Sequence, residues 1–216
     1  MHQSLFRDTE QFVKNELNAA DSGHDWHHAY RVWKMARLLA KDTNADTTII
    51  EIAALIHDVA DVKINNNPLA GISRCKIFLN SLEITSEQQV KILEIIQNLS
   101  FRKEAPPALK KNLEFMLVQD ADRLDALGAI GIARVFSYGQ KSGQPLHDPD
   151  LVPRLGMSKE EYKQNKSTSL NHFHEKLFLL KDLMNTSKAR NIAKEREEFM
   201  KRFIEQFLSE WNQLDF

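Results

Sequence analysis

The sequence is poor in the residues that interrupt helices or cross-link a chain. Its 216 residues include one cysteine, seven glycines and six prolines. A lone cysteine excludes an internal disulfide and suits a reducing compartment, and we expect Cys75 to be a small packing residue. Scarce glycine and proline, together with plentiful leucine, isoleucine, alanine, lysine and glutamate, favour helices over sheets. We therefore expect an all-α protein.

Long apolar runs and an excess of charge of one sign are also missing. No apolar stretch approaches the roughly 20 residues that span a membrane, and residues 1–8 lack the apolar segment of a signal peptide. The 29 lysines and arginines nearly balance the 30 aspartates and glutamates, which gives a formal net charge of −1. We expect a cytoplasmic, soluble protein that binds neither nucleic acid nor membranes.

Apolar residues recur at helical spacing along most of the chain. Gly23 ends the first helical stretch, and Asp25 can cap the next. The stretch 47–60 is almost wholly apolar, as is typical of a central helix. Helices are expected over residues 3–20, 26–41, 47–60, 69–82, 86–99 (with Val90, Leu93 and Ile96 inward), 109–137, 170–184 and 187–214. Without a convincing boundary between them, we expect one domain over residues 1–216.

Residues 138–169 lack this periodicity and hold several glycines and prolines. A segment this long without periodicity is usually a functional loop or a disordered one, so we expect a flexible or lid-like segment. Farther along, Phe199, Phe203, Phe207 and Trp211 form a stripe at helical spacing. We interpret the stripe as core packing or as the interface of a homodimer.

The most informative stretch is 53–63, where an apolar helical run ends in His57 and Asp58. An imidazole and a carboxylate are costly to bury unless something pairs with them, and a metal ion is one such partner. Adjacent helical residues diverge by about 100°, yet both can reach an ion that lies between their directions. His28 and Asp122 also lie in mostly apolar helical stretches and fit as further ligands.

The mixed set of imidazole and carboxylate ligands indicates which ion to expect. Such a set suits octahedral Mn²⁺, Fe²⁺, Co²⁺ or Ni²⁺ better than tetrahedral zinc. We expect one divalent ion, with Mn²⁺ preferred and Mg²⁺ less suitable. Four protein ligands leave about two positions for water or substrate oxygen, which predicts a catalytic site. Spacing alone does not decide which of Asp120, Asp122 and Asp125 is the ligand.

These residues also carry a family resemblance. The order His28, then His57 with Asp58, then Asp122 resembles the H…HD…D signature of HD-domain metal-dependent phosphohydrolases. The flanking segments are similar to a small bacterial branch whose members hydrolyse nucleoside triphosphates, including deoxynucleotides, to monophosphate and pyrophosphate. The similar segments are residues 24–32, 55–61, 119–134 and 172–177. The resemblance covers most of the chain. It implies an HD-domain helical bundle and favours Asp122 as the fourth ligand.

The expected chemistry is that of a metal beside phosphate. The ion lowers the pKa of a bound water, polarises a phosphoryl oxygen and orients the attack. Asp61, three residues after Asp58, is the candidate for proton transfer, and the resembled family often places an acidic residue just past the HD pair. His24 is expected either to contact phosphate or to orient a ligand.

Cationic side chains should complete the site, because the charge on the phosphoryl oxygens must be stabilised. Arg31, Lys63 and Lys176 are candidate phosphate contacts, and the alternative for each is a solvated side chain. His172 and His174 lie two residues apart and therefore face different sides of their helix. We favour His172 as the one that faces the site.

Other readings of the same residues stay open. His57 could be a helix-terminal histidine stabilised by the helix dipole, with Asp58 exposed. The site could instead belong to a nucleotide monophosphatase or to a hydrolase of an alarmone pyrophosphate. A non-catalytic regulatory protein that binds metal or nucleotide is the alternative of a different class. A dinuclear phosphodiesterase is disfavoured because a clear second set of bridging ligands is missing, although His24 and His27 keep it open.

Overall fold

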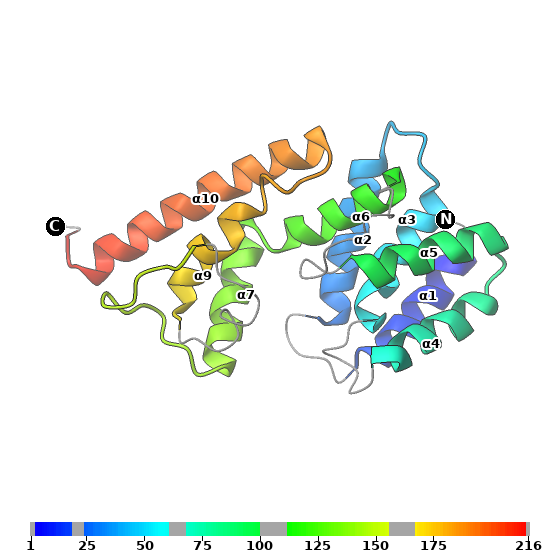
Figure 1. Ribbon diagram of the computed structural model, residues 1–216, viewed down its shortest axis with the longest axis horizontal. Coiled ribbons are helices and arrows are strands. Elements are labelled where there is room, and N and C mark those ends of the chain that lie inside the picture. Colours follow the sequence, from blue (N-terminus) through cyan, green and yellow to red (C-terminus); the bar gives the residue numbers. More distant parts are fainter. Residues whose placement is uncertain (1–2, 19–23, 61–67, 100–111, 156–166, 215–216) are drawn as a thin grey trace. The chain divides into compact units, whose positions relative to one another are not determined.

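The computed structural model describes residues 3–18, 24–60, 68–99, 112–155 and 167–214 (Figure 1). Within these ranges the secondary structure is helical and contains no strand, so the all-α prediction is confirmed. No helix there is long and apolar enough to cross a membrane. The chain divides into two compact units, residues 1–122 and 123–216. A single domain over residues 1–216 therefore stays a prediction.

The first unit is a bundle built around one buried helix. Its elements are α1 (Gln3–Glu16), α2 (Trp26–Ala40), α3 (Thr47–Ile56), the 3₁₀ turn η1 (His57–Ala60), α4 (Pro68–Asn80), α5 (Ser86–Asn98) and most of α6 (Leu113–Asp125). Helix α3 contacts α1, α2 and α5 (Figure 1). Every residue of α3 from 49 to 56 is buried, which agrees with its apolar sequence. Cys75 of α4 is fully buried as well.

Two aspartates fix where α2 and α3 begin. Asp25 precedes α2, and one of its carboxylate oxygens accepts a hydrogen bond from the His28 backbone N–H at 2.8 Å. Asp46 precedes α3 and accepts from the backbone N–H groups of Thr48 and Ile49. An N-cap carboxylate satisfies N–H groups that have no partner within the helix. The cap predicted at Asp25 is thus confirmed, and both capped helices lead to the candidate metal ligands.

The second unit consists of the end of α6, α7 (Gly128–Lys141), α9 (Ser169–Glu175), the 3₁₀ turn η2 (Leu177–Leu179) and α10 (Ser187–Trp211). Helix α7 packs against α9 and α10. Phe136 of α7 contacts Phe203 and Phe207 of α10, with ring centroids about 6 Å apart. The predicted aromatic stripe therefore contributes to packing within this unit through its centre, whereas its ends, Phe199 and Trp211, stay more than 40% exposed.

The helix predicted over residues 109–137 is wrong at its middle. Helix α6 ends at Asp125 and α7 begins at Gly128, whose φ of +73° favours glycine. A Cβ atom at Gly131 would lie only 2.2 Å from the carbonyl oxygen of Ala126, so the turn can fold back closely only over a glycine. Periodicity alone could not show this break, because the apolar spacing continues across it.

Other boundaries also differ from the prediction. Residues 57–60 form a 3₁₀ turn rather than a last α-helical turn, α9 stops at Glu175 instead of continuing to residue 184, and α7 continues to Lys141. In α5, Val90 is 55% exposed, and Ile92, Ile95 and Ile96 make the buried face. Several neighbouring faces of a helix can fit an apolar pattern with a period near 3.6 residues, and tertiary packing decides which face is buried.

The segment predicted to be flexible or lid-like, 138–169, is described up to residue 155 and from residue 167. Beyond α7 it is tied to the start of α9 by backbone hydrogen bonds. Ser169 N–H donates to the Pro145 carbonyl and Leu170 N–H to the Leu146 carbonyl, both at 3.0 Å. The Asn171 side chain donates to the Leu151 carbonyl at 2.7 Å. The lid role stays a prediction.

Candidate metal centre

The centre lies in the first unit, where the start of α2 meets the turn after α3. His28 is in the first turn of α2 and is 1% exposed. His57 and Asp58 open η1 directly after α3 and are 7% and 3% exposed. The Nε2 atoms of the two histidines lie 3.3 Å apart. The structure thus brings two imidazoles that are far apart in the sequence to one buried point.

A backbone carbonyl group fixes the orientation of the His57 ring. Its Nδ1 atom lies 2.8 Å from the backbone carbonyl oxygen of Ala54. Because a carbonyl oxygen can only accept, Nδ1 must carry the proton, and Nε2 of the neutral ring then holds a lone pair. This is the tautomer that a metal ligand needs. Ala54 does not stand out in the sequence, although its position three residues before His57 is a spacing at which helical groups meet.

Asp58 uses its two carboxylate oxygens toward different partners. One oxygen, Oδ1, lies 3.3 Å from His57 Nε2. The other, Oδ2, lies 3.0 Å from His24 Nδ1 and 3.4 Å from His28 Nε2. Successive residues of a 3₁₀ turn point about 120° apart. The side chains of His57 and Asp58 nevertheless both reach the cluster.

Asp122 completes the cluster from α6. One of its carboxylate oxygens, Oδ1, lies 3.4 Å from His28 Nε2 and 3.7 Å from His57 Nε2. The Asp122 side chain is 34% exposed and that of His24 is 27% exposed, so the cluster is accessible on this side. Of the competing aspartates, Asp125 instead binds Arg134 at 2.6 Å, and Asp120 is fully buried with interactions of its own.

The electrostatics of the cluster favour two ionised carboxylates. Burial by itself would raise the pKa of Asp58. Without a bound metal, the protonated forms of His57 and His28 and the hydrogen bond from His24 outweigh this effect, so the pKa lies well below its usual range. Burial likewise opposes ionisation of Asp122, and its hydrogen bond with His28 together with the histidine charges still lowers its pKa. Ionised carboxylates are the form that binds a metal cation.

This donor set fits a divalent cation. Two groups of three residues have ligand atoms that all lie within 4.8 Å of one another: His28, His57 and Asp122, and His24, His28 and Asp58. The charge of Asp58 acts to raise the pKa of Asp122, and a cation bound between the two carboxylates would remove this repulsion. The residues would hold the ion through the Nε2 atoms of His28 and His57 and oxygens of Asp58 and Asp122.

The two groups overlap in a way that favours one ion. They share His28, whose Nε2 has a single lone pair and can therefore bind only one cation. An ion between His28, His57 and Asp122 would leave His24 as a hydrogen-bond donor to Asp58. These described residues therefore agree better with a mononuclear centre than with two ions that share His28.

The structure describes only some of the other candidate site residues. Asp61 and Lys63 lie outside the described residues. Arg31 is half-buried on α2, one turn after His28. His172 and Lys176 belong to the second unit, at α9 and its C-cap, and both are half-buried. Two further histidines, His27 and His174, are exposed.

Comparisons with known proteins cover the part of the chain that holds these residues. Residues 25–127 match the family described as HD domain, and this range contains all four candidate ligands. The Bacillus subtilis protein YpgQ, described as uncharacterized, is 36% identical over 196 residues, which are 90% of this chain and 88% of YpgQ.

Solved structures cover nearly the whole chain. A Lactobacillus plantarum protein matches with a TM-score of 0.83 at 38% identity, over 98% of this chain and 99% of that one. A Bacillus thuringiensis protein described as an HD-superfamily hydrolase matches with a TM-score of 0.78 at 45% identity, over 97% and 98%. YpgQ in complex with ADP matches with a TM-score of 0.75 at 36% identity, over 94% and 96%. With its ligand cluster inside the matched range, the chain belongs to the HD-domain superfamily.

Proposed function

We propose that the chain is a metal-dependent phosphohydrolase that cleaves nucleoside or deoxynucleoside triphosphates to monophosphate and pyrophosphate. The observation that carries the proposal is the convergence of His28, His57, Asp58 and Asp122 in one cluster, which is buried around the histidines and exposed beside Asp122. A divalent ion held there would activate a water and polarise a phosphoryl oxygen. The four ligands leave coordination positions for such oxygens.

Relatives support the reaction class and the kind of substrate. The Bacillus thuringiensis structure is described as an HD-superfamily hydrolase, and it aligns over almost the entire chain. YpgQ was solved in complex with ADP, so a relative of similar length and fold binds an adenine nucleotide. We propose that this chain shares both the hydrolase activity and the binding of nucleotides.

We assign His24 to the positioning of Asp58. Its Nδ1 lies 3.0 Å from Asp58 Oδ2, and a donated hydrogen bond there holds the carboxylate so that Oδ1 stays beside His57 Nε2. Groups that orient a ligand in this way commonly affect metal affinity. The His24 side chain is 27% exposed, and contact of this side chain with substrate is part of the proposal.

The remaining candidate residues are given roles by their side-chain chemistry and their positions in the sequence. Asp61 is proposed as the proton-transfer group and Lys63 as a phosphate contact, and both lie outside the described residues. Arg31, on the helix that carries His28, is proposed to contact phosphate as well. His172 and Lys176 are proposed as substrate contacts from the second unit. Phosphoryl transfer needs such cations to stabilise the charge that develops on the phosphoryl oxygens.

Among divalent ions, Mn²⁺ is the proposed cofactor. Two imidazole nitrogens with two carboxylate oxygens suit Mn²⁺, Co²⁺, Ni²⁺ or Fe²⁺, whereas Mg²⁺ prefers sites made of oxygen. The metal preference is therefore part of the test of function.

The test is a screen of nucleoside mono-, di- and triphosphates against Mn²⁺, Co²⁺, Ni²⁺ and Mg²⁺, with the products identified by chromatography. We expect a triphosphate to yield monophosphate and pyrophosphate, fastest with Mn²⁺. Repeating the reaction in ¹⁸O-water should place the label on the monophosphate, because attack then occurs at the α-phosphorus.

Each other outcome identifies another function. Release of inorganic phosphate from a monophosphate would indicate a nucleotide monophosphatase, and pyrophosphate from an alarmone would indicate an alarmone hydrolase. Saturable binding of nucleotide without product under any of the four metals would indicate a regulatory protein and would refute the proposed reaction.

A further inference from the structure

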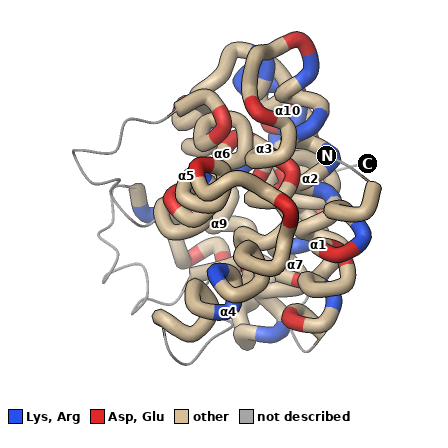
Figure 2. Tube along the Cα trace, turned by 90° about the vertical axis from the view of Figure 1, so that its right-hand side faces the viewer, with Lys and Arg blue, Asp and Glu red and all other residues tan. Residues whose placement is uncertain are grey.

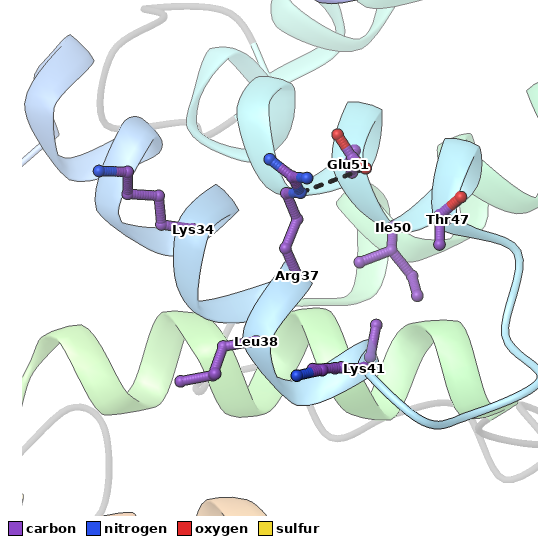
Figure 3. A pocket seen from close by; sticks show the side chains of 8 residues that line it. Lys34, Arg37, Leu38, Lys41, Thr47, Ile50 and Glu51 are labelled. Atoms are coloured by element: carbon purple, nitrogen blue, oxygen red, sulfur yellow. Dashed lines mark ion pairs between the residues drawn. The ribbon is translucent and has the colours of Figure 1, made fainter. Parts of the chain in front are cut away.

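A cavity of about 580 Å³ lies between the C-terminal half of α2 and the N-terminal half of α3 (Figure 3). Sites for small molecules typically have volumes of about 300–1,000 Å³. The lining residues all belong to the first unit: Lys34, Arg37, Leu38, Ala40, Lys41, Thr47, Ile50 and Glu51. None of them has been assigned to the metal centre.

The cavity and the metal centre lie at opposite ends of the α2–α3 pair. His28 near the start of α2 meets His57 just after the end of α3, whereas Arg37 near the end of α2 meets Glu51 in the first half of α3. The two helices therefore run antiparallel. At a rise of 1.5 Å per residue, Arg37 lies about 14 Å along α2 from His28, so a ligand in the cavity would not touch the candidate metal ligands.

The guanidinium of Arg37 is held in place at the cavity. It lies over the Trp33 ring at 5.0 Å from the centroid, and its Nε atom is 3.6 Å from a carboxylate oxygen of Glu51. Figure 3 shows Arg37 reaching from α2 toward Glu51 on α3, with Ile50 beside the pair. Since Nε faces Glu51, the terminal nitrogens remain to bind an anion in the two-pronged geometry that guanidinium groups favour.

The cavity is cationic in a chain whose charges are otherwise balanced. Lys34, Arg37 and Lys41 recur three and four residues apart, so they share one face of α2, and Glu51 is the one acidic residue among the lining groups. Glu51 is only 6% exposed, and its other oxygen accepts a hydrogen bond from the Trp33 indole at 2.9 Å. Figure 2 shows acidic and basic positions interspersed along the described trace. Three cationic residues of α2 and one carboxylate of α3 therefore line the cavity.

Apolar side chains line the remainder of the cavity. Leu38 is 48% exposed although it lies beside the cations, and Ile50, which also lines the cavity, is fully buried. Burial of apolar surface is favourable, so an anion that carries an apolar body gains more here than a bare inorganic ion.

We propose that this cavity binds a phosphorylated small molecule, with its phosphate between Arg37 and Lys41 and its apolar body against Leu38. The site is separate from the metal centre, and its binding does not depend on the proposed hydrolysis. Two nitrogens of Arg37 and one of Lys41 supply charge-assisted donors to the phosphate, and the volume admits a ligand of nucleotide size.

The test follows the indole N–H signal of Trp33 by ¹H–¹⁵N NMR while phenyl phosphate is titrated into the full chain. The protein has three tryptophans, so a Trp33→Phe variant assigns the signal. We expect the Trp33 signal to shift saturably, because this indole contacts the Arg37–Glu51 pair, and the signal of Trp211 in the second unit to stay unchanged. Inorganic phosphate should bind more weakly than phenyl phosphate, and a nucleoside monophosphate should bind at least as tightly.

Matched variants separate this site from surface charge and from the metal centre. Arg37→Lys keeps a cation beside Glu51 but removes the two-pronged donor, and Lys41→Gln removes one charge; each should weaken phenyl phosphate binding about tenfold. Lys76→Gln, an exposed lysine on α4, and His57→Ala should leave the Trp33 titration unchanged. The proposal is refuted by a Trp33 signal that does not saturate, by an affinity of Arg37→Lys and Lys41→Gln equal to that of the wild type, or by binding that disappears in His57→Ala.

Discussion

The Nε2 atoms of His28 and His57 lie 3.3 Å apart in the interior of the first unit, and carboxylate oxygens of Asp58 and Asp122 lie within 3.7 Å of them. Two ring nitrogens this close cannot both carry a proton toward each other without repulsion. A cation bound between them removes this conflict and compensates the two carboxylates. The stability of the unit should therefore depend on metal.

The first prediction concerns metal-dependent stability. Saturating Mn²⁺ should stabilise the wild-type protein by about 2.7 kcal/mol at a hundredfold excess over its Kd, and His57→Ala should lose both this stabilisation and the bound metal. Metal content by mass spectrometry and urea unfolding with and without Mn²⁺ measure the two effects. His27→Ala, an exposed neighbour of His28, is the control. Metal content and turnover that survive in both His57→Ala and Asp58→Ala would show that the site is misplaced.

The second prediction separates the positioning role of His24 from a structural one. Asn places an amide N–H where the Nδ1–H of histidine lies, whereas Gln places it near Nε2. His24→Asn should therefore keep Mn²⁺ affinity close to wild type, and His24→Gln should weaken it by about 10- to 100-fold. Calorimetric titration of the metal measures this without turnover. Equal Mn²⁺ affinities of the two variants would show that the hydrogen bond from His24 to Asp58 does not contribute to metal binding.

The third prediction concerns Asp61. Asp61→Asn should retain the bound metal and lower kcat by about 10²-fold or more, as for the loss of a general acid–base group. Single-turnover kinetics with a triphosphate and metal analysis of the same preparation provide the measurement. An unchanged rate would exclude Asp61 from proton transfer.

The fourth prediction concerns a carboxylate that joins two parts of the second unit. Glu175 is 9% exposed, accepts from the Ser167 hydroxyl with both oxygens at 3.0 Å and accepts from the Arg154 backbone N–H at 3.2 Å. Its substitution by alanine removes the acceptor of these part-buried donors, so Glu175→Ala should lower the free energy of unfolding by about 1–3 kcal/mol. Glu195→Ala, at an exposed position of α10, should change it little. Similar values for the two variants in urea unfolding would contradict the prediction.

The fifth prediction concerns pH. Burial would raise the pKa of Glu197, but hydrogen bonds from Lys201 and Lys181 outweigh it and the pKa is lowered from its ordinary 4.5. A carboxylate with a lowered pKa contributes stability that is full above its unfolded value and is lost as pH falls through its folded value. The difference in unfolding free energy between wild type and Glu197→Gln should therefore be constant near neutral pH and shrink below about pH 4.5. A difference that grows on acidification would contradict this sign.

Some properties of the protein follow from its sequence alone. Scarce glycine and proline with apolar residues at helical spacing determined the all-α class, and Asp25 could be recognised as a cap because a carboxylate before a helix satisfies free N–H groups. The candidate ligands were also recognisable, because histidine and aspartate are rarely placed in apolar helices without partners.

Other features depend on the tertiary structure and could not be predicted from the spacing of apolar residues. The break at Gly128, the 3₁₀ turn that begins at His57, and the contact of Ala54 with the His57 ring all depend on how the backbone folds back over a few residues. Three aspartates of one helix looked alike in the sequence, and the packing of α6 set Asp122 beside His28 while Asp125 binds Arg134. The cavity beside Arg37 arises only where α2 and α3 meet. Local spacing fixes which residues share a face, but only the packing of distant segments fixes which faces meet.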